Sequence, residues 1–329
     1  MIRKLKLLCL YLLKATGCFY IARFLTRSAL RILCYHGAAL ADEHVWNPGT
    51  FMSAATFQRR MRLLKKLGFE VLPLAEAARR FREGTLPAAA VVITIDDGWL
   101  GTFQHMVPVL AEHGLPASLY VTTYYVSTRT RVFNVALSYL HWKAGQGFDI
   151  AQVLNNGEAL PPAEREALLD RLGLEVVGSA WSAAPLFRLV TDDQIAEMVR
   201  SGVDIQLHTH RHRLPTDEPG LRDELLTNAR FLGPLVREPL KHLCYPSGEW
   251  EPKHLPLIRA LDIETATTTD SGLNWPRAEP LLLSRFLDSE TKTDIEFEAE
   301  LCGVIDLGKR VVGWFRPPPA RSPQDQVVA

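Results

Sequence analysis

The feature that most constrains the fold of this chain is a repeated succession of short apolar runs and helical patterns. Residues 89–95 (AAVVITI) form a β-branched run typical of a strand that is buried on both faces. A helical pattern over 102–113 ends at Gly114, and a second apolar run follows at 117–122. Strand, helix and strand at this spacing favour βα units and a parallel sheet. The length of 329 residues suits one α/β barrel with an insertion.

This rhythm extends over most of the chain but is interrupted in the middle. Further strands are expected at 31–37, 69–72, 203–207, 242–245, 265–268 and 281–286. Residues 127–190 lose the pattern, which predicts a helical insertion over the barrel mouth. We therefore expect one barrel domain over 31–316. The proline-rich and polar residues 317–329 are expected to be a disordered tail.

The first 30 residues combine basic and apolar side chains. Their unbroken apolar run, 7–13, is far shorter than the ~20 residues that span a bilayer. The segment is interpreted as a basic amphipathic helix on a membrane surface, which predicts a cytoplasmic protein or one peripheral on the inner membrane. A helix packed on its own domain is an equally open interpretation. A cleaved signal peptide, and with it export, is the third and least favoured one.

Charge and cysteine usage exclude several classes of protein. Lys plus Arg equals Asp plus Glu at 37 each, which argues against a nucleic-acid binder. The five cysteines are scattered and contain no CxxC pair, so they indicate neither a disulfide framework nor a zinc ribbon. A chain of this size can bury a large core without a metal staple, so any bound metal is expected to serve chemistry.

Two adjacent carboxylates, Asp96 and Asp97, directly follow the apolar strand at 89–95. Strand ends at one face of a parallel barrel are where such folds place catalytic groups. Adjacent carboxylates raise the pKa of one partner unless a cation neutralises them. A metal on one carboxylate and proton transfer by the other would relieve this crowding. The alternative is an ordinary Asp-Gly turn before Gly98.

Three histidines lie within five residues at another strand end: His208, His210 and His212. Imidazole suits zinc and other transition metals. His208 and His212 could reach one ion if the chain curls after the strand, whereas His208 and His210 could do so if it stays extended. An exposed polar loop is the alternative. The loop at 245–248 (YPSG) follows a further strand and could offer backbone N–H groups to an oxyanion at the same face.

Together these motifs resemble those of the polysaccharide deacetylases with a NodB homology domain, carbohydrate esterase family 4. Residues 94–98 (TIDDG) look like the family's first motif, usually Thr-Phe-Asp-Asp-Gly. Residues 208–212 (HTHRH) look like the second, His-Ser/Thr-x-x-His, and 245–248 like the third in its Tyr-Pro-x-Gly form. The resemblance runs from about Arg31 to Phe286 and implies a distorted (β/α) barrel of parallel strands.

The resemblance implies one divalent transition metal held by Asp97, His208 and His212, with no part for His210. Zinc is expected first, and cobalt, nickel or iron would also suit two histidines and a carboxylate. Asp96 would be the general base. The Tyr245 backbone N–H would hold the oxyanion.

The chain departs from the family pattern in two places. Many members begin the third motif with Arg, whereas Cys244 stands there, and no histidine follows His254 to supply the usual late general acid. One branch of the family begins with a strand ending in Tyr-His, as residues 35–36 do here, so we expect His36 to act as the acid. The alternative is that His36 only caps its strand. Arg285 resembles a late-strand arginine of the family and is expected to steady Asp96.

The function that this resemblance implies is hydrolysis of an N-acyl group on a sugar. The substrate would be a polysaccharide, such as an exopolysaccharide under biosynthesis, or a lipid-linked glycan. Two other classes remain open. One is an amide or imide hydrolase acting on a small molecule that is not a sugar. The other is a non-catalytic sugar-binding homologue.

Overall fold

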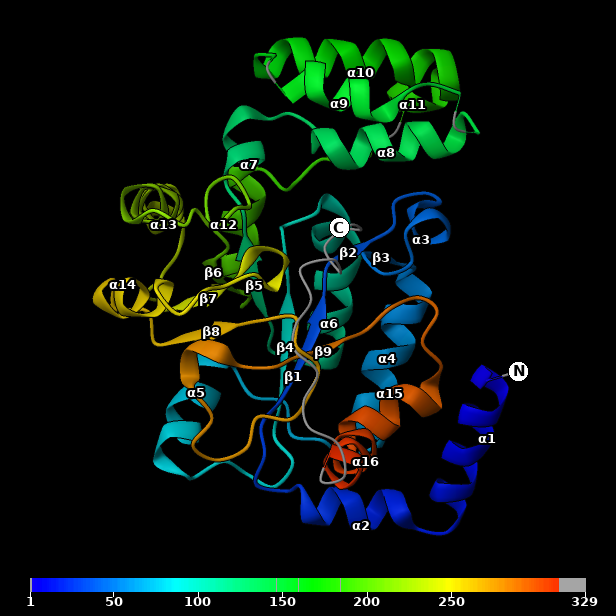
Figure 1. Cartoon of the computed structure of the whole chain (residues 1–329), viewed down its shortest axis with the longest axis vertical. Helices are drawn as coiled ribbons and strands as arrows, with labels where there is room; N and C mark the ends of the chain where they lie inside the picture. Colours follow the sequence, from blue (N-terminus) through cyan, green and yellow to red (C-terminus); the bar gives the residue numbers. More distant parts are fainter. Residues whose placement is uncertain (1, 146, 159, 184, 314–329) are drawn as a thin grey trace.

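A parallel sheet of seven strands lies at the centre of the molecule. The computed structural model describes residues 2–145, 147–158, 160–183 and 185–313. The strand order is β8-β7-β6-β5-β4-β1-β9, and every neighbouring pair is parallel. The strands are β1 (Arg31–Tyr35), β4 (Val91–Ile95), β5 (Ser118–Val121), β6 (Asp204–Leu207), β7 (His242–Cys244), β8 (Thr265–Thr267) and β9 (Phe286–Leu287). The sheet curls into a half-barrel with helices around it, which confirms the predicted distorted (β/α) barrel (Figure 1).

The register of the sheet brings distant parts of the sequence to one edge. Tyr35 pairs with Ile95, so the residues that follow β1 and β4 leave the sheet side by side. Leu207 at the end of β6 pairs with Val121 on one side and with Leu243 on the other. All five residues of β4 are buried, as the β-branched run predicted. Polar residues that follow these strands therefore meet at the carboxyl end of the sheet.

Helices and short strands between the sheet strands complete the barrel. The helices are α3 (Glu43–Trp46), α4 (Ala54–Lys66), α5 (Leu74–Glu83), α6 (Val107–His113), α12 (Asp192–Arg200), α13 (Glu218–Leu232), α14 (His254–Ala260), α15 (Asp294–Leu301) and α16 (Val304–Gly313). Three 3-10 turns lie at Gly233–Leu235, Pro246–Gly248 and Pro280–Leu282, and β2 (Gly37–Ala38) pairs with β3 (Phe51–Met52). The helix predicted over 102–113 begins as a π-helical turn, Thr102–Met106. A Cβ on Gly101 would lie 1.8 Å from the Ala38 carbonyl oxygen, so only glycine permits this approach to β2.

A helical subdomain stands between β5 and β6, where the insertion over 127–190 was predicted. It contains α7 (Tyr124–Thr128), α8 (Phe133–Lys143), α9 (Ile150–Glu158), α10 (Pro162–Val177) and α11 (Ser179–Ala183). Figure 1 shows α8 to α11 stacked beyond the strand ends. Arg131 ion-pairs with Glu166 and Asp170 of α10, and Trp181 is fully buried in this subdomain. The helices of the subdomain are thus held together by ion pairs and by a buried tryptophan.

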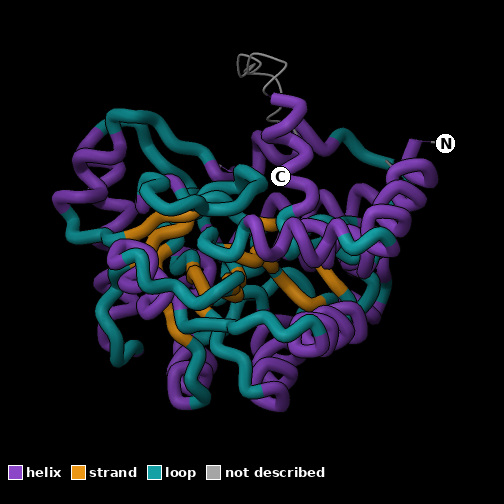
Figure 2. Tube along the Cα trace, turned by 90° about the horizontal axis from the view of Figure 1, so that it is seen from below, coloured by secondary structure: helices purple, strands orange, loops and turns teal. Residues whose placement is uncertain are grey.

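The N-terminal segment differs from its prediction, because it forms two helices instead of one. α1 (Ile2–Ala15) and α2 (Cys18–Leu25) meet at a bend of 80°. Gly17 at the break has φ 79°, a left-handed conformation that ends the first helix. Neither helix is long and apolar enough by itself to cross a membrane, and the bent pair satisfies that test only in length and composition. α1 packs on α15 and α2 on α16 (Figure 1), and the view from below shows the N-terminal helix at the edge of the molecule (Figure 2). The tail predicted over 317–329 lies outside the described residues.

Candidate active site

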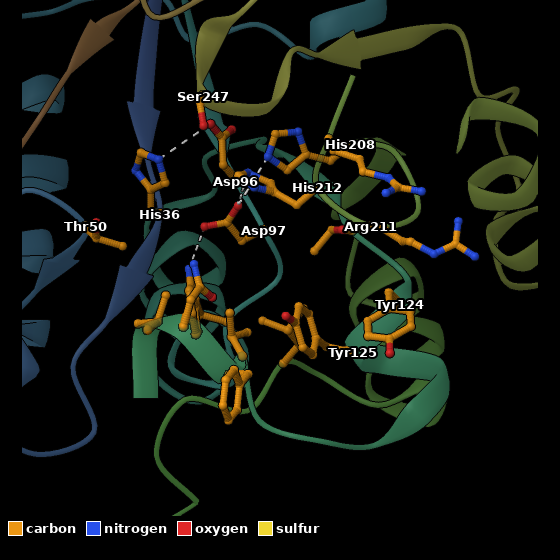
Figure 3. A pocket seen from close by; sticks show the side chains of 18 of the residues that line it. His36, Thr50, Asp96, Asp97, Tyr124, Tyr125, His208, Arg211, His212 and Ser247 are labelled. Atoms are coloured by element: carbon orange, nitrogen blue, oxygen red, sulfur yellow. Dashed lines mark hydrogen bonds and ion pairs between the residues drawn. The ribbon is translucent and has the colours of Figure 1, made fainter. Parts of the chain in front are cut away.

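The predicted site residues line one pocket at the carboxyl ends of the strands. Its volume is about 630 Å³. The lining includes all seven predicted residues: His36, Asp96, Asp97, His208, His212, Tyr245 and Arg285. In Figure 3 the two carboxylates lie in the middle, with His36 on one side and the other two labelled histidines opposite. The fold therefore brings together residues from β1, β4, β6 and β7 and the segment before β9.

Asp97, His208 and His212 converge on one point in the pocket. The Asp97 Oδ1 atom lies 3.2 Å from His208 Nε2 and 3.5 Å from His212 Nε2. One ligand atom from each of the three residues lies within 4.8 Å of the others. Two imidazole nitrogens and one carboxylate oxygen form a donor set that suits a divalent transition metal. The neighbouring His210 does not join them, since its Nδ1 is hydrogen-bonded with Thr123 Oγ1 at 2.9 Å. This favours the curled arrangement over the extended one.

Left-handed backbone at two of the three residues makes this convergence possible. Asp97 has φ 70° and His212 has φ 54°, and Thr209 between the histidines has φ 62°. Left-handed conformations are uncommon for residues with a Cβ, and held strain of this kind costs roughly 1–3 kcal/mol per residue and concentrates at functional sites. The chain therefore turns sharply after β4 and after β6, so that both side chains point back into the pocket.

Further contacts orient two of the three candidate ligands, His208 and Asp97. His208 Nδ1 donates a hydrogen bond to the Cys244 carbonyl oxygen at 2.9 Å, which leaves the Nε2 lone pair directed at the point of convergence. The Trp99 indole N–H donates to Asp97 Oδ2 at 2.7 Å, which leaves Oδ1 for a cation. Asn228 Oδ1 accepts the His208 backbone N–H at 3.0 Å. The sequence motifs did not reveal these positioning groups. The only signal was the place of Trp99 directly after the Asp-Asp-Gly turn.

The environment of the pocket shifts the pKa values of the two histidines in opposite directions. Burial, followed by the nearby His208, lowers the pKa of His212 to about 4, so its imidazole is neutral at pH 7. Burial acts to lower the pKa of His208 as well, but Cys244 and the hydrogen bond to Asp97 outweigh it and raise this pKa. Burial acts to raise the pKa of Asp97, but the hydrogen bond to His208 outweighs it and holds this pKa below its usual range. A divalent cation would therefore compete with a proton on His208.

Asp96 lies beside this cluster and is held by Arg285. The guanidinium donates to both carboxylate oxygens, with Nη1 to Oδ1 at 2.7 Å and Nη2 to Oδ2 at 2.8 Å. Burial acts to raise the pKa of Asp96, but the charge and hydrogen bonds of Arg285 outweigh it and lower the pKa to about 2. Two buried thiols, Cys34 and Cys244, also approach Asp96 Oδ2, at 3.6 and 3.4 Å. Asp96 and Arg285 thus form a buried ion pair.

His36 follows β1 and lies on the other side of Asp96. Its Nε2 atom is 3.9 Å from Asp96 Oδ2, and its side chain is 23% exposed. The His36 backbone carbonyl accepts a hydrogen bond from the Thr102 hydroxyl at 3.0 Å, so the backbone is fixed while the ring lines the pocket. This position suits a group that exchanges protons with a bound substrate.

The Tyr245 backbone N–H, expected to hold the oxyanion, has a hydrogen-bond partner within the sheet. That N–H donates to the Thr267 carbonyl oxygen at 3.1 Å, because the pairing of β7 with β8 continues one residue beyond the end of β7. The Tyr245 hydroxyl donates to the Leu281 carbonyl oxygen at 3.0 Å. Neither donor of Tyr245 can therefore meet an oxyanion. Ser247, two residues on and with φ 54°, lines the pocket as well.

A family model described as polysaccharide deacetylase matches residues 83–266, more than half of the chain. The chain belongs to the polysaccharide deacetylase family. The match covers Asp96, Asp97, His208, His212 and Tyr245 of the deacetylase site, whereas His36 and Arg285 lie outside it. Membership supports a hydrolase that acts on the N-acetyl group of a sugar. No curated protein sequence matches the chain.

Solved structures of other deacetylases share the fold. The deacetylase PplD from Streptococcus pyogenes is 19% identical with a TM-score of 0.61, over 84% of this chain and 99% of that one. IcaB from Ammonifex degensii is 20% identical with a TM-score of 0.58, over 83% and 97% of the two chains. A de-N-acetylase from Aggregatibacter actinomycetemcomitans is 14% identical with a TM-score of 0.56, over 83% and 99%. At these identities the likeness shows the fold of this deacetylase, and its chemistry has to be argued from its own residues.

Proposed function

We propose that this chain is a metal-dependent N-deacetylase that hydrolyses the acetamido group of a sugar in a polysaccharide or a lipid-linked glycan. The observation that carries the proposal is the convergence of Asp97, His208 and His212 directly beside the Asp96–Arg285 pair in one open pocket. Metal ligands and a separate proton acceptor are the two parts that water-driven cleavage of an amide requires.

The three converging side chains fit a divalent metal. Their donor atoms are already close together, and the hydrogen bonds from Trp99 and to the Cys244 carbonyl oxygen hold two of them in the orientation that a ligand needs. When bound there, such a metal would polarise the acyl carbonyl and lower the pKa of water. Zinc is the first expectation, and cobalt, nickel or iron would suit the same donors.

Asp96 supplies the proton acceptor. Its low pKa keeps the carboxylate ionised at neutral pH, so it can take the proton of the attacking water. Arg285 fixes both carboxylate oxygens and stops the side chain from turning towards Asp97. Arg285 is thus a positioning residue that acts through Asp96.

His36 supplies the proton donor. Departure of the amine requires a proton on its nitrogen, because an amide anion is a very poor leaving group. His36 lines the pocket 3.9 Å from Asp96 and lies opposite the predicted metal ligands (Figure 3). A substrate whose acyl group lies between the two sides would place its nitrogen near this imidazole.

The pocket walls are compatible with a glycan. Tyr124 and Tyr125 of α7 form an aromatic pair in the lining, with ring centroids 5.1 Å apart. Arg211 and Arg213 lie on the same wall and add polar donors. Aromatic faces with a few convergent polar groups are the usual lining of a small-molecule or sugar site.

The test measures metal content and acetate release together. The full chain is purified next to a His208→Ala, His212→Ala variant and a control, His105→Ala, His113→Ala, which removes two histidines outside the pocket. We expect about one transition metal per chain in the natural protein and in the control, as the three-ligand site predicts. The site variant should lose both the metal and acetate release from N-acetylated oligosaccharides.

Other results would favour the alternative functions. Bound metal with no acetate release from any N-acetylated sugar would favour an amide or imide hydrolase on another small molecule. If no protein binds metal after addition of zinc, cobalt or nickel, the proposal is wrong and the non-catalytic sugar-binding reading replaces it.

A further inference from the structure

The N-terminal helices expose an unusual amount of apolar surface. Within the described part of the chain, nine of the thirteen exposed large hydrophobic side chains belong to α1 and α2. Figure 1 shows these helices meeting at one corner of the molecule, away from the strand ends that carry the pocket. We call this surface the apolar corner and define it by Leu5, Leu8, Leu12, Tyr20, Ile21 and Phe24.

α1 exposes its apolar face to solvent. Two of its basic side chains face the protein: Lys6 and Lys14 ion-pair with Glu296 and Glu298 of α15. Its leucines at positions 5, 8 and 12 recur at helical spacing on the opposite face and are 62%, 55% and 57% exposed. A surface helix of a soluble protein normally turns its apolar face to the core and its charges to solvent. The reversal indicates that the outer face of α1 has an apolar partner.

α2 repeats this arrangement. Phe19 and Ala22 anchor one face of the helix on the protein. On the other face, Tyr20 is 80% exposed, and Ile21 and Phe24 are more than half exposed. The apolar surface thus continues around the bend at Gly17 and covers both sides of the corner.

The charge around the apolar corner selects one kind of partner. Residues 1–41 contain seven lysines and arginines and no aspartate or glutamate. Lys6 and Lys14 are ion-paired with α15 and Arg31 is buried, so the positive charge of this corner comes from Arg3, Lys4, Arg23 and Arg27. Arg23 donates to the carbonyl oxygens of Leu67 and Gly68, and Arg27 to that of Phe24, so these contacts do not neutralise their charge. A second copy of the chain would bring two such basic surfaces together. A lipid leaflet with anionic headgroups offers both an apolar layer and the opposite charge.

We propose that the apolar corner docks into the interfacial layer of a membrane that contains anionic lipids. The leucines and aromatic side chains insert at the level of the headgroups, and Lys4, Arg23 and Arg27 lie against the anionic surface. The bent helix pair holds the protein on the membrane without crossing it. This inference does not depend on the catalytic proposal, because no residue of the pocket takes part.

The test is sedimentation of the full chain with lipid vesicles. One set of vesicles contains phosphatidylglycerol and phosphatidylcholine, and the other contains phosphatidylcholine alone. The test variant is Leu8→Ser, Leu12→Ser, Phe24→Ser. The matched control, Val45→Ser, Leu174→Ser, Leu226→Ser, removes three exposed apolar side chains elsewhere. We expect the natural chain and the control to bind anionic vesicles, and the test variant to bind at least about tenfold more weakly, because each buried apolar side chain contributes to interfacial affinity.

A second variant, Lys4→Glu, Arg27→Glu, guards against misfolding of the first, since it changes two exposed residues and keeps every apolar side chain. It should bind anionic vesicles more weakly, with unchanged thermal unfolding. Equal binding by all proteins, or no binding by the natural chain, would overturn the proposal. A different result would also overturn it: the natural chain does not bind vesicles and forms a dimer in analytical ultracentrifugation, and the Leu8→Ser, Leu12→Ser, Phe24→Ser variant is a monomer.

Discussion

At the scale of single residues, Asp96 and Asp97 are adjacent in sequence but have separate partners. Asp96 faces Arg285 and His36, whereas Asp97 faces two histidines and the indole N–H of Trp99. The left-handed φ of Asp97 turns its side chain away from that of its neighbour. Each carboxylate is therefore stabilised in its ionised form by its own cations, and the two can serve different chemical purposes.

The proposed proton donor His36 can be tested with two substrates. In the His36→Ala variant, kcat for an N-acetylated sugar should fall about 10²- to 10⁴-fold, the usual contribution of a positioned acid. Hydrolysis of 4-nitrophenyl acetate should change little, because nitrophenolate leaves without a proton. Asp96→Asn should slow both reactions, since both need activated water. Steady-state kinetics on both substrates measures the split.

An equal loss on the two substrates would contradict the donor role of His36. Such a result would indicate that His36 shapes the pocket or positions Asp96. Metal content measured on the same sample separates that outcome from loss of the metal.

The motifs could be predicted from sequence because each is local. Asp96, Asp97, His208 and His212 lie directly after apolar runs that identify strand ends. The engagement of the Tyr245 N–H could not be predicted, since it depends on how far β7 pairs with β8. The same holds for the Cys244 carbonyl, which orients a histidine of another strand. Contacts that depend on strand register cannot be predicted from the motifs of a single sequence.

At the scale of elements, the short strands β7 and β8 lie where the sequence predicted them, whereas two other expected strands differ. The strand expected at 69–72 is reduced to an isolated bridge between Val71 and Val91. The strand expected at 281–286 is a 3-10 turn followed by β9, which starts at Phe286 opposite Leu33. Short apolar runs take the conformation that their neighbours impose. At the N-terminus, Gly17 divides what the apolar and basic pattern presented as one helix.

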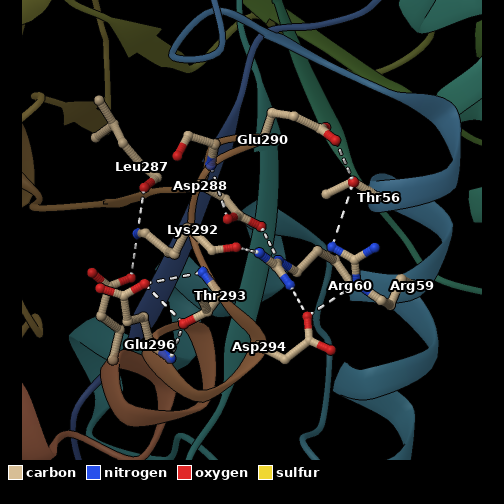
Figure 4. Close-up of polar contacts among 12 residues, drawn as sticks. Thr56, Arg59, Arg60, Leu287, Asp288, Glu290, Lys292, Thr293, Asp294 and Glu296 are labelled. Atoms are coloured by element: carbon tan, nitrogen blue, oxygen red, sulfur yellow. Dashed lines mark hydrogen bonds and ion pairs between the residues drawn. The ribbon is translucent and has the colours of Figure 1, made fainter. Parts of the chain in front are cut away.

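The attachment of α4 depends on a buried arginine (Figure 4). Arg60 is fully buried and donates from Nε to Asp288 Oδ2 at 2.8 Å, and it also contacts Asp294 and the Lys292 carbonyl oxygen. Its neighbour Arg59 pairs with Asp294 at the surface, where both side chains are about half exposed. The two arginines thus offer a buried and an exposed ion pair on one helix.

Replacing each arginine with methionine should separate the two cases. Arg60→Met should lower the free energy of unfolding by ~3–5 kcal/mol, because it leaves Asp288 buried without its cation. Arg59→Met should cost at most ~1 kcal/mol. Urea unfolding followed by circular dichroism measures both. Similar values for the two variants would show that Asp288 is protonated or hydrated when Arg60 is absent.

At the scale of the whole molecule, the proposed metal ligands come from the ends of two strands, β4 and β6, that are separated by β5 in the sheet. Asp97 follows β4, and both histidines follow β6. A ligand that binds only the folded chain stabilises it by mass action, about 2.7 kcal/mol at 100 times Kd. Zinc added to the metal-depleted protein should therefore raise its free energy of unfolding by about this amount. EDTA should reverse the gain. The His208→Ala, His212→Ala variant should show no gain, and an equal gain in that variant would place the metal elsewhere.

The pairing of Asp96 with Arg285 has a consequence for the synthesis of the chain on the ribosome. The two residues are 189 positions apart, so the carboxylate is synthesised long before its cation. At roughly 5–20 residues per second, a ribosome needs roughly 10–40 s to travel that far. Throughout this interval the Asp96 carboxylate of the nascent chain lacks the Arg285 guanidinium with which it pairs in the folded protein. The proposed hydrolysis of a sugar N-acyl group, which uses Asp96 held by Arg285, would therefore begin only after nearly all of the barrel has been made.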